Sequence, residues 1–276
     1  MLALLTGTSS GIGLASSVAL AARGHRVVAT MRDPSRGDAL REAAAAAGVE
    51  VTLAALDVTD DDAVRRVVEE VRAEHGAVDL LVNNAGAATV GTLEHLTDAE
   101  LAACLDLNFT GTVRVMRAVV PDMRERGAGR IVNVTSVGGI VGQPFNDAYC
   151  AAKFAVEGLS ESLAPVLRRF GVHLSVVEPG PVATEFVATA GRTVGGWVAD
   201  PEDPYAELFA SYLSRTGDTF AAAQTPEDVA RVVVAIAEDP APRFRYQTSD
   251  AATAFVAPKL ADLDGEAVVS MTGHWI

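Results

Sequence analysis

A tyrosine and a lysine, Tyr149 and Lys153, stand four positions apart in a stretch, 147–170, whose apolar pattern predicts a helix. This spacing puts both side chains on one helical face, one turn apart. A free phenol titrates near ~10, and lowering its pKa by ~3 units requires about 4 kcal/mol. An ammonium at ~4 Å supplies about that much at an effective dielectric of ~20. The pair therefore predicts a tyrosine that exchanges a proton with an alcohol or carbonyl oxygen, as hydride transfer at the adjoining carbon requires.

Three further polar residues could support this pair, because a tyrosine and a lysine at this spacing occur in many helices by chance. Ser136 follows the apolar run 130–135 and could donate a hydrogen bond to the substrate oxygen, or it could simply form a turn. Asn108 interrupts a helical pattern and has an ordinary alternative as a helix cap. Thr184 ends the segment Pro179–Thr184, which could equally be a plain loop. Their joint occurrence favours a catalytic interpretation.

A glycine-rich turn, Thr6–Gly13, lies between the first apolar run and the first helical pattern. Glycines let the backbone approach a pyrophosphate closely, and a helix N-terminus directs unpaired N–H groups toward it. Glycine also makes ordinary tight turns, so the strand–turn–helix context carries the interpretation. The turn therefore predicts a phosphate site built from Gly7, Ser9, Ser10, Gly11, Ile12 and Gly13.

The end of the second apolar run bears on cofactor choice. An enzyme that uses NAD places a carboxylate here to bind the ribose hydroxyls. This sequence has Thr30 and Met31 at that place, and Arg32 follows. A guanidinium can hold a 2′-phosphate in bidentate fashion, with Ser10 as a second donor. Asp33 could instead face the ribose, and Arg32 could be a solvated surface residue, but the pattern favours NADP(H).

Short apolar runs alternate with helical patterns along the chain. Near-continuous apolar runs predict strands buried on both faces, and their alternation with helices is typical of a doubly wound parallel sheet. We expect a single α/β domain with a Rossmann fold over 1–276, helices on both faces, a substrate-capping segment near 186–216 and a C-terminal extension near 249–276. Proline lacks an N–H, so Pro165 is expected to break or bend the helix after Lys153. The expected strands are Leu2–Thr6, Arg26–Thr30, Val51–Leu56, Val78–Asn83, Arg130–Thr135, Val172–Val177 and Phe244–Thr248, and the expected helices are near 11–23, 36–47, 60–75, 98–126, 147–170, 205–216 and 226–238.

Composition excludes several other classes of protein. The net charge of −14 argues against a nucleic-acid or anionic-membrane partner, since both need a basic face. No apolar run reaches the ~18 residues that a membrane span needs, and strand-like residues begin too early for a signal peptide. Cys104 and Cys150 are expected to be buried free thiols, and the five histidines show no metal-binding spacing. We expect a cytoplasmic enzyme without a metal.

Three segments and four single residues together resemble the short-chain dehydrogenase/reductase family. Thr6–Gly13 resembles its TGxxxGxG turn, Asn83–Gly86 its NNAG element and Pro179–Thr184 its PGxxxT element, and Asn108, Ser136, Tyr149 and Lys153 stand in the family's catalytic order. The resemblance implies that Asn108 holds a water for proton relay and that Lys153 binds the nicotinamide ribose. It further implies cofactor contacts from Asp57, Val58, Asn84, Ala85, Gly86, Pro179, Gly180, Val182 and Thr184.

Within that family the chain is most similar to the subgroup of estradiol 17β-dehydrogenase type 1 and photoreceptor retinol dehydrogenase. Residues 29–33, 144–150, 170–175 and 178–186 carry this similarity. It implies NADPH and a lipophilic carbonyl or alcohol substrate, with Gln143 and Phe186 beside it. The polar Gln143 departs from the steroid enzyme, and 197–216 contains no histidine, so recognition of a steroid phenol end is not expected.

Two alternatives remain open at this point. One is a ketoreductase that acts on acyl or polyketide intermediates, although such chains usually end soon after the sheet. The other is a non-catalytic NADP-sensing regulator, although such proteins typically lose the tyrosine or the lysine. The family resemblance also implies a homodimer or homotetramer that pairs through the helices near 98–126 and 147–170.

Overall fold

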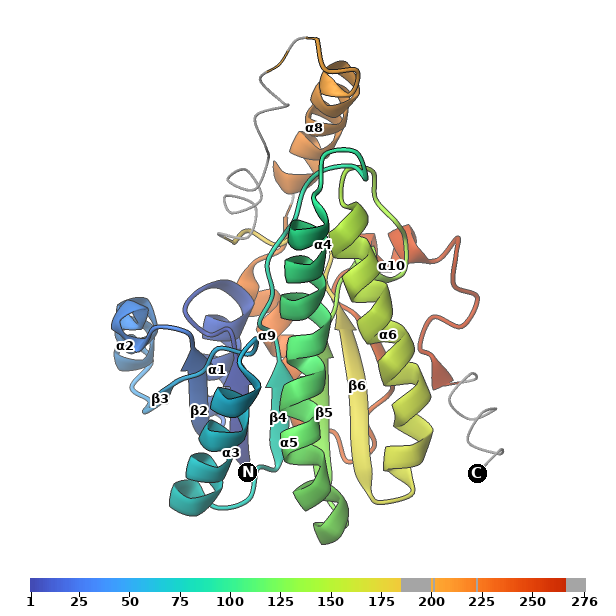
Figure 1. The fold of residues 1–276 in the computed structure, drawn as a ribbon. Helices are drawn as coiled ribbons and strands as arrows, with labels where there is room; N and C mark the ends of the chain where they lie inside the picture. Colours follow the sequence, from blue (N-terminus) through green and yellow to red (C-terminus); the bar gives the residue numbers. More distant parts are fainter. Residues whose placement is uncertain (185–199, 201, 222, 267–276) are drawn as a thin grey trace.

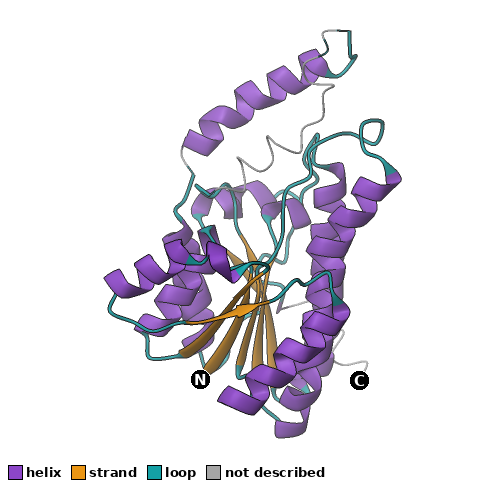
Figure 2. Ribbon diagram, turned by 60° about the vertical axis from the view of Figure 1, so that its left-hand side comes forward, coloured by secondary structure: helices purple, strands orange, loops and turns teal. Residues whose placement is uncertain are grey.

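The structure is a computed structural model that describes residues 1–184, 200, 202–221 and 223–266. At its centre lies a sheet of seven parallel strands in the order β3-β2-β1-β4-β5-β6-β7 (Figures 1 and 2). The strands are β1 (Leu2–Thr6), β2 (Arg26–Met31), β3 (Thr52–Ala55), β4 (Leu80–Asn83), β5 (Gly129–Val134), β6 (Val172–Glu178) and β7 (Arg245–Gln247).

Helices connect the strands and cover both faces of the sheet (Figure 2). Capping boxes start two of them, at Thr97 with Glu100 and at Thr225 with Asp228, so their first N–H groups are satisfied locally. The α-helices are α1 (Gly11–Ala22), α2 (Asp38–Ala46), α3 (Asp61–His75), α4 (Asp98–Leu105), α5 (Gly111–Arg126), α6 (Asp147–Arg168), α8 (Ala206–Ala221), α9 (Pro226–Glu238) and α10 (Asp250–Val256). The shorter elements are the 3₁₀ helices η1 (Pro34–Arg36) and η3 (Val137–Gly139) and the π-helical turn η2 (Asp106–Thr110).

The strands divide the interior into two hydrophobic cores. Successive residues of a strand point to opposite faces, so Leu2 and Leu4 of β1 enter one core, and Ala3 and Leu5 enter the other. The first core includes residues of α3, α5 and α6, and the second includes residues of α1, α2 and α9. Because both faces are covered, the central strands β1, β2 and β4 are mostly apolar, which is the pattern that predicted a parallel sheet.

The expected doubly wound α/β fold is confirmed. The strand order reverses between β1 and β4, and in such sheets ligands bind outside the carboxyl ends of the strands at this switch point. The two cysteines are buried and free, as expected. Among the described residues, no helix is both long and apolar enough to cross a membrane.

The expectation that Pro165 breaks the long helix is wrong. Helix α6 continues through Pro165 to Arg168, and α5 likewise contains Pro121. A proline removes one N–H bond and crowds the carbonyl four residues earlier, but the other bonds of the helix remain. Pro165 is buried beside Ala164 and Leu167, so packing on the sheet offsets the lost bond. The tilt that we expected beyond Pro165 stays a prediction.

The two helical prolines differ in burial, and they should therefore respond differently to replacement. Pro121→Ala, at an exposed position, restores a helical hydrogen bond without losing packing. We expect it to raise the melting temperature by about 2–4 °C, which corresponds to roughly 1 kcal/mol in a protein of this size. Pro165→Ala restores the same kind of bond but leaves a small void in the core, so it should give no gain. Thermal unfolding followed by circular dichroism measures both, and an equal gain in both variants would show that Pro165 is a tolerated defect.

Candidate active site

The glycine-rich turn after β1 packs directly on the turn after β4. A methyl group at Gly7 would lie 2.6 Å from the Cα of Ala85, and one at Gly13 would lie 2.2 Å from the Gly7 carbonyl oxygen. Gly7 and Gly11 also have φ of +68° and +57°, which side chains rarely adopt. These contacts leave no room for a Cβ, so the turn brings bare backbone to the carboxyl edge of the sheet.

Helix α1 begins at this turn with donors that its own structure does not use. The first N–H groups of any helix lack an intrahelical acceptor. Ser10 is the N-cap residue in an extended conformation, and its hydroxyl makes no capping bond. The sequence-predicted residues Ser9, Ser10, Gly11, Ile12 and Gly13 thus form a donor-rich helix start, which fits a pyrophosphate. Thr184 reaches the same place, because a methyl at Gly11 would lie 3.0 Å from its Cγ2.

Asn84 holds the two turns together. Its side-chain Nδ2 donates to the carbonyl oxygens of Thr6, at 3.1 Å, and Gly7, at 2.8 Å. The backbone N–H groups of Asn84 and Ala85 donate to the Thr6 hydroxyl at 3.0 and 3.1 Å. The side-chain amide N–H groups of Asn84 are therefore committed to the protein backbone, and a cofactor here would meet mainly the backbone of 84–86.

The end of β2 carries an exposed guanidinium and a carboxylate that is already engaged. Asp33 Oδ1 accepts from the Ser35 N–H at 2.9 Å and caps η1, and the Ser35 hydrogen bonds lower the pKa of Asp33. Partial burial raises the pKa of Asp57, but hydrogen bonds from Thr59 and the charge of Arg32 outweigh it, so the net shift is downward. Arg32 and Asp57 therefore lie in one neighbourhood. Val58, by contrast, is a core residue packed on Gly111.

Asn108 lies in the π-helical turn η2 and is buried. Its Oδ1 accepts from the Ala87 N–H at 3.1 Å, and its Nδ2 donates to the carbonyls of Ala87 and Cys104. Gly86 permits this approach, because a methyl there would lie 2.6 Å from Asn108 Oδ1 and 3.6 Å from Lys153 Nζ. The interrupted helical pattern seen in the sequence thus corresponds to a π turn, a deviation common at functional sites.

Ser136 and Tyr149 meet at the carboxyl end of β5. Ser136 starts η3, and its Oγ accepts from the Gly138 N–H at 3.0 Å. Burial raises the pKa of Tyr149 well above its ordinary value, while a hydrogen bond with the Ser136 side chain lowers it. The phenol on its own is thus a poor base, and it needs a positive charge to ionise near neutral pH.

Lys153 is the charge beside this phenol. It is 5% exposed, and its Nζ lies 5.8 Å from the centroid of the Tyr149 ring. Burial lowers the pKa of Lys153 to about 8. An ammonium has three N–H donors, and among the described residues Lys153 bonds only the Val134 carbonyl, at 3.1 Å. The two remaining donors are buried at the cofactor edge of the sheet, which fits acceptors such as ribose hydroxyls.

Comparison with known proteins bears on this arrangement. The short chain dehydrogenase family matches residues 1–194. The chain belongs to this family. It is 42% identical to human 17-beta-hydroxysteroid dehydrogenase type 1, over 97% of this chain and 83% of that protein. It is 41% identical to retinol dehydrogenase 8 of Bos taurus, over 98% and 88% of the two chains.

Two solved structures extend the similarity to the fold. A short-chain dehydrogenase from Streptomyces avermitilis superposes with a TM-score of 0.79 at 32% identity and covers 99% of this chain and 95% of that chain. A single-residue variant of actinorhodin polyketide ketoreductase with NADPH superposes with a TM-score of 0.76 at 30% identity and covers 89% and 94%. As a member of the short-chain dehydrogenase family, the protein is an oxidoreductase that acts on CH–OH and C=O groups.

In this short-chain dehydrogenase the turn after β6 is fixed by a residue that the sequence did not single out. Gln224 precedes α9, and its backbone N–H donates to the Pro181 carbonyl while its carbonyl accepts from the Ala183 N–H. Val182 pairs with Gln224 as an isolated bridge. Single main-chain pairs of this kind leave no motif in a sequence, so pattern reading could not find Gln224.

The C-terminal extension also supports the site. Within the described residues 249–266 of this segment, Ala252 and Val256 of α10 pack on Val137 and Ile140, next to Ser136. A methyl at Gly180 would lie 3.6 Å from the Ala252 Cβ. The start of the extension therefore contacts both the Ser136 turn and the turn after β6.

An aromatic cluster anchors helix α8, which lies above the carboxyl edge of the sheet (Figure 1). Phe145, whose φ of +62° is unusual for a residue with a side chain, packs edge-on against Phe209 with centroids 5.0 Å apart. Tyr212 adds a contact to Phe145, and its hydroxyl accepts from Asn146 Nδ2 at 2.9 Å. Of the predicted substrate contacts, Gln143 lies in the loop before α6, where its N–H donates to Cys150 Sγ, and Phe186 lies outside the described residues.

The close approach at Gly86 gives a direct test of this geometry. Gly86→Ala should push Asn108 and Lys153 apart, lowering both thermal stability and affinity for the nucleotide cofactor, the latter by at least about tenfold. Gly158→Ala is the matched control, since Gly158 lies in α6 with nothing within 4 Å of an added methyl. It should stabilise the protein by about 0.5–1 kcal/mol. Melting curves and fluorescence titration with NADPH measure both, and unchanged affinity in Gly86→Ala would contradict the packing described.

Proposed function

We propose that this short-chain dehydrogenase interconverts a carbonyl and an alcohol on an apolar substrate, with NADP(H) as cofactor and Tyr149 as the acid and base. The observation that carries the proposal is the buried ammonium of Lys153 beside Tyr149. Among the described residues, this ammonium donates to one acceptor, the Val134 carbonyl. Burying a charge is unfavourable unless the charge is paired or hydrogen-bonded. Because Lys153 keeps spare N–H donors at the switch point of the sheet, its burial favours a catalytic role over a purely structural one.

Each residue of the site has a separate task in the proposed reaction. When bound, the nicotinamide supplies or accepts the hydride at the substrate carbon. Ser136 Oγ, oriented by the Gly138 N–H, donates to the substrate oxygen. The Tyr149 hydroxyl gives its proton to that oxygen in reduction and takes one back in oxidation. Lys153 favours the ionised phenol, and Asn108, which meets Lys153 at Gly86, holds the water through which protons are exchanged.

The cofactor contacts follow the same edge of the sheet. The pyrophosphate would lie on the α1 start, formed by Gly7, Ser9, Ser10, Gly11, Ile12 and Gly13. The adenosine half of the cofactor would contact Arg32, Asp57 and Val58. The nicotinamide half would meet Asn84, Ala85, Gly86, Tyr149 and Lys153, and on its other side Pro179, Gly180, Val182 and Thr184.

Removal of the phenol hydroxyl tests the proton donor. Tyr149→Phe should lose at least about 90% of carbonyl reduction while NADPH affinity stays nearly unchanged, because only the proton-transferring atom is lost. Stopped assays of reduction and fluorescence titration of NADPH give the two quantities. Residual activity above a tenth of the wild-type rate would remove Tyr149 from the proposed role.

The proposed NADP(H) preference rests on the end of β2. Asp33 caps η1 with its carboxylate, so it is held in the loop rather than directed by itself to a ribose. Arg32 is exposed next to Asp57, and no hydrogen bond to Arg32 occurs within the described part of the chain. A free guanidinium at this place fits a 2′-phosphate.

Arg32→Ala should therefore reduce the preference for NADPH over NADH by roughly 10- to 150-fold, the range of a charge-assisted hydrogen bond. Arg41→Ala is the control, because Arg41 is a neighbouring exposed arginine that pairs with Asp38 at 2.9 Å. The ratio of kcat/KM for the two cofactors is the measurement. Equal use of NADH and NADPH by the unmodified enzyme would show that the end of β2 binds a ribose instead.

The apolar substrate is proposed from two observations. Relatives at 42% and 41% identity are named for a hydroxysteroid and for retinol. The aromatic cluster of Phe145, Phe209 and Tyr212 lies where residues 186–216 would cap the pocket. The structural similarity to a polyketide ketoreductase keeps acyl or polyketide intermediates as the second candidate. NADPH oxidation with steroid ketones, retinal, aromatic ketones and keto esters separates the two, and a complete lack of turnover would favour a non-catalytic NADP sensor.

We further propose that the whole chain is one domain that assembles as a homodimer or homotetramer. A shallow apolar groove runs between α5 and α6, the helices expected to pair, and it is lined by Val113, Met116, Arg117, Val120, Leu159, Leu163 and Leu167. Light scattering of the purified protein gives the mass that decides this.

A further inference from the structure

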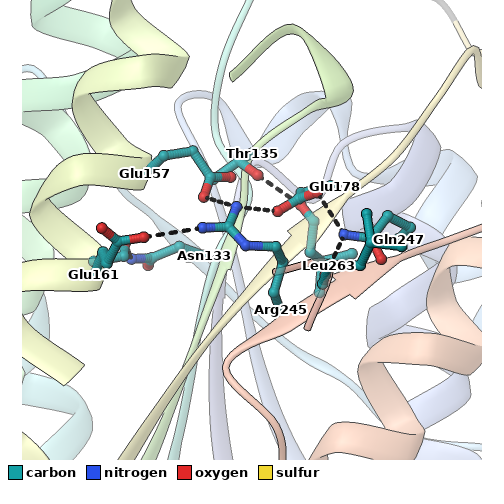
Figure 3. A network of polar contacts seen from close by, with 10 residues as sticks. Asn133, Thr135, Glu157, Glu161, Glu178, Arg245, Gln247 and Leu263 are labelled. Atoms are coloured by element: carbon teal, nitrogen blue, oxygen red, sulfur yellow. Dashed lines mark hydrogen bonds and ion pairs between the residues drawn. The ribbon is translucent and has the colours of Figure 1, made fainter. Parts of the chain in front are cut away.

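A buried cluster of charges joins α6, β6 and β7 (Figure 3). Its centre is Arg245 of β7, whose side chain is 4% exposed. Arg245 Nη1 donates to Glu157 Oε2 at 2.8 Å and also to Glu178 Oε1, and Nη2 donates to Glu161 at 3.3 Å. Gln247 donates to the other oxygen of Glu178 at 2.8 Å. One guanidinium thus serves three carboxyl groups that come from α6 and β6.

Two of these carboxyls adjoin the proposed catalytic groups. Glu157 follows Lys153 by four residues on α6, which places both on one face of the helix, one turn apart. A methyl at Gly139 would lie 3.0 Å from Glu157 Cγ and 3.1 Å from the Lys153 carbonyl oxygen, so the turn after Ser136 packs on the same place. Glu178 is the last residue of β6 and directly precedes Pro179 and Gly180.

The cluster has more carboxyls than cations to match them. Burial and the nearby Glu178 raise the pKa of Glu157 to about 8. Burial likewise raises the pKa of Glu178. Glu157 Oε1 is buried and has no hydrogen-bond partner in the described residues. The Glu157–Glu178 pair therefore holds a proton more readily than two exposed carboxyls would, and it becomes more negative as the pH rises.

We propose that Glu157, held by Arg245, is a positioning residue that keeps Lys153 protonated at mildly alkaline pH, and that Arg245 ties the catalytic helix to the turn after β6 through Glu178. The inference rests on the proposed function of Lys153. An ordinary structural cluster would need only to join α6 and β6, and it would not need a carboxyl one turn from the catalytic ammonium.

The sign of the effect follows from the groups around each partner. Lys153 is faced by Tyr149, Cys104 and Glu157, and Glu157 is faced by Lys153, Arg245, Glu178 and, one turn on, Glu161. A negative Glu157 favours the charged form of Lys153 and so raises its pKa. Loss of that charge should let Lys153 deprotonate at lower pH.

The chain offers a readout that does not need turnover, because Lys153 and Lys259 are its two lysines. Lysine labelled with ¹³C at Cε gives two resonances, and Lys259, whose Nζ lies 4.3 Å from the ring centroid of Phe154, serves as internal reference. In Glu157→Gln the Lys153 titration should move to lower pH by about one unit. Glu161 also bonds Arg245, but its side chain is 38% exposed, the bond is long at 3.3 Å, and it lies two turns from Lys153, so Glu161→Gln should leave the titration nearly unchanged.

Two further variants keep the test informative if Glu157→Gln does not fold. Glu157→Asp retains the charge and should titrate like the wild type. Glu178→Gln removes the competitor for Arg245, so Glu157 ionises more readily and the Lys153 titration should move upward. An unshifted titration in folded Glu157→Gln, or a downward shift in Glu178→Gln, would overturn the inference.

The enzymatic counterpart is the pH profile of carbonyl reduction. In Glu157→Gln the alkaline fall of kcat should begin about one pH unit earlier while KM for the carbonyl substrate changes little, whereas Glu161→Gln should follow the wild type. Lower melting temperatures in both variants with identical pH profiles would show a purely structural cluster. Absence of turnover in the wild type would instead contradict the proposed function, and the lysine titration would still decide the inference about Glu157.

Discussion

The burial of one ammonium group, that of Lys153, is the constraint on which the rest of the active site depends. Removing a charge from water is unfavourable, and here it lowers the pKa of the lysine to about 8. The Val134 carbonyl at the end of β5 bonds the ammonium, and the glycine at position 86 leaves room beside it, because a methyl there would lie 3.6 Å from Lys153 Nζ. In the proposed mechanism, the tyrosine one turn earlier can ionise near neutral pH only while this charge is present.

Much of the fold and of the site could be predicted because their determinants are local. Apolar strands alternate with helical patterns, so the order of elements and the parallel sheet follow from periodicity. The glycines of the first turn are fixed by close contacts at Gly7 and Gly13, which is why they form a readable motif. Tyr149 and Lys153 lie on one helix, so their spacing alone places them together.

The parts that escaped prediction depend on contacts between distant segments. Gln224 fixes the turn after β6 through main-chain bonds, and these leave no side-chain signature. Arg245 and Glu157 are buried partners from β7 and α6, so nothing in their local sequence marks them as neighbours. For Pro165 the local sequence predicted a break that does not occur. The proline does remove one helical hydrogen bond, but packing of its neighbours in the core outweighs that loss and α6 continues to Arg168.

The distribution of charge explains how the protein combines an acidic composition with a site that uses cations. Its net charge of −14 lies largely on exposed acidic side chains, which water and salt screen. Lys153 and Arg245, by contrast, are buried, where each charge acts more strongly on its neighbours. Because Glu157 adjoins both cations, the catalytic helix and the sheet edge are coupled electrostatically as well as by packing. If Tyr149 transfers the proton as proposed, a change at the edge strand β7 should alter that step without touching either the substrate or the cofactor.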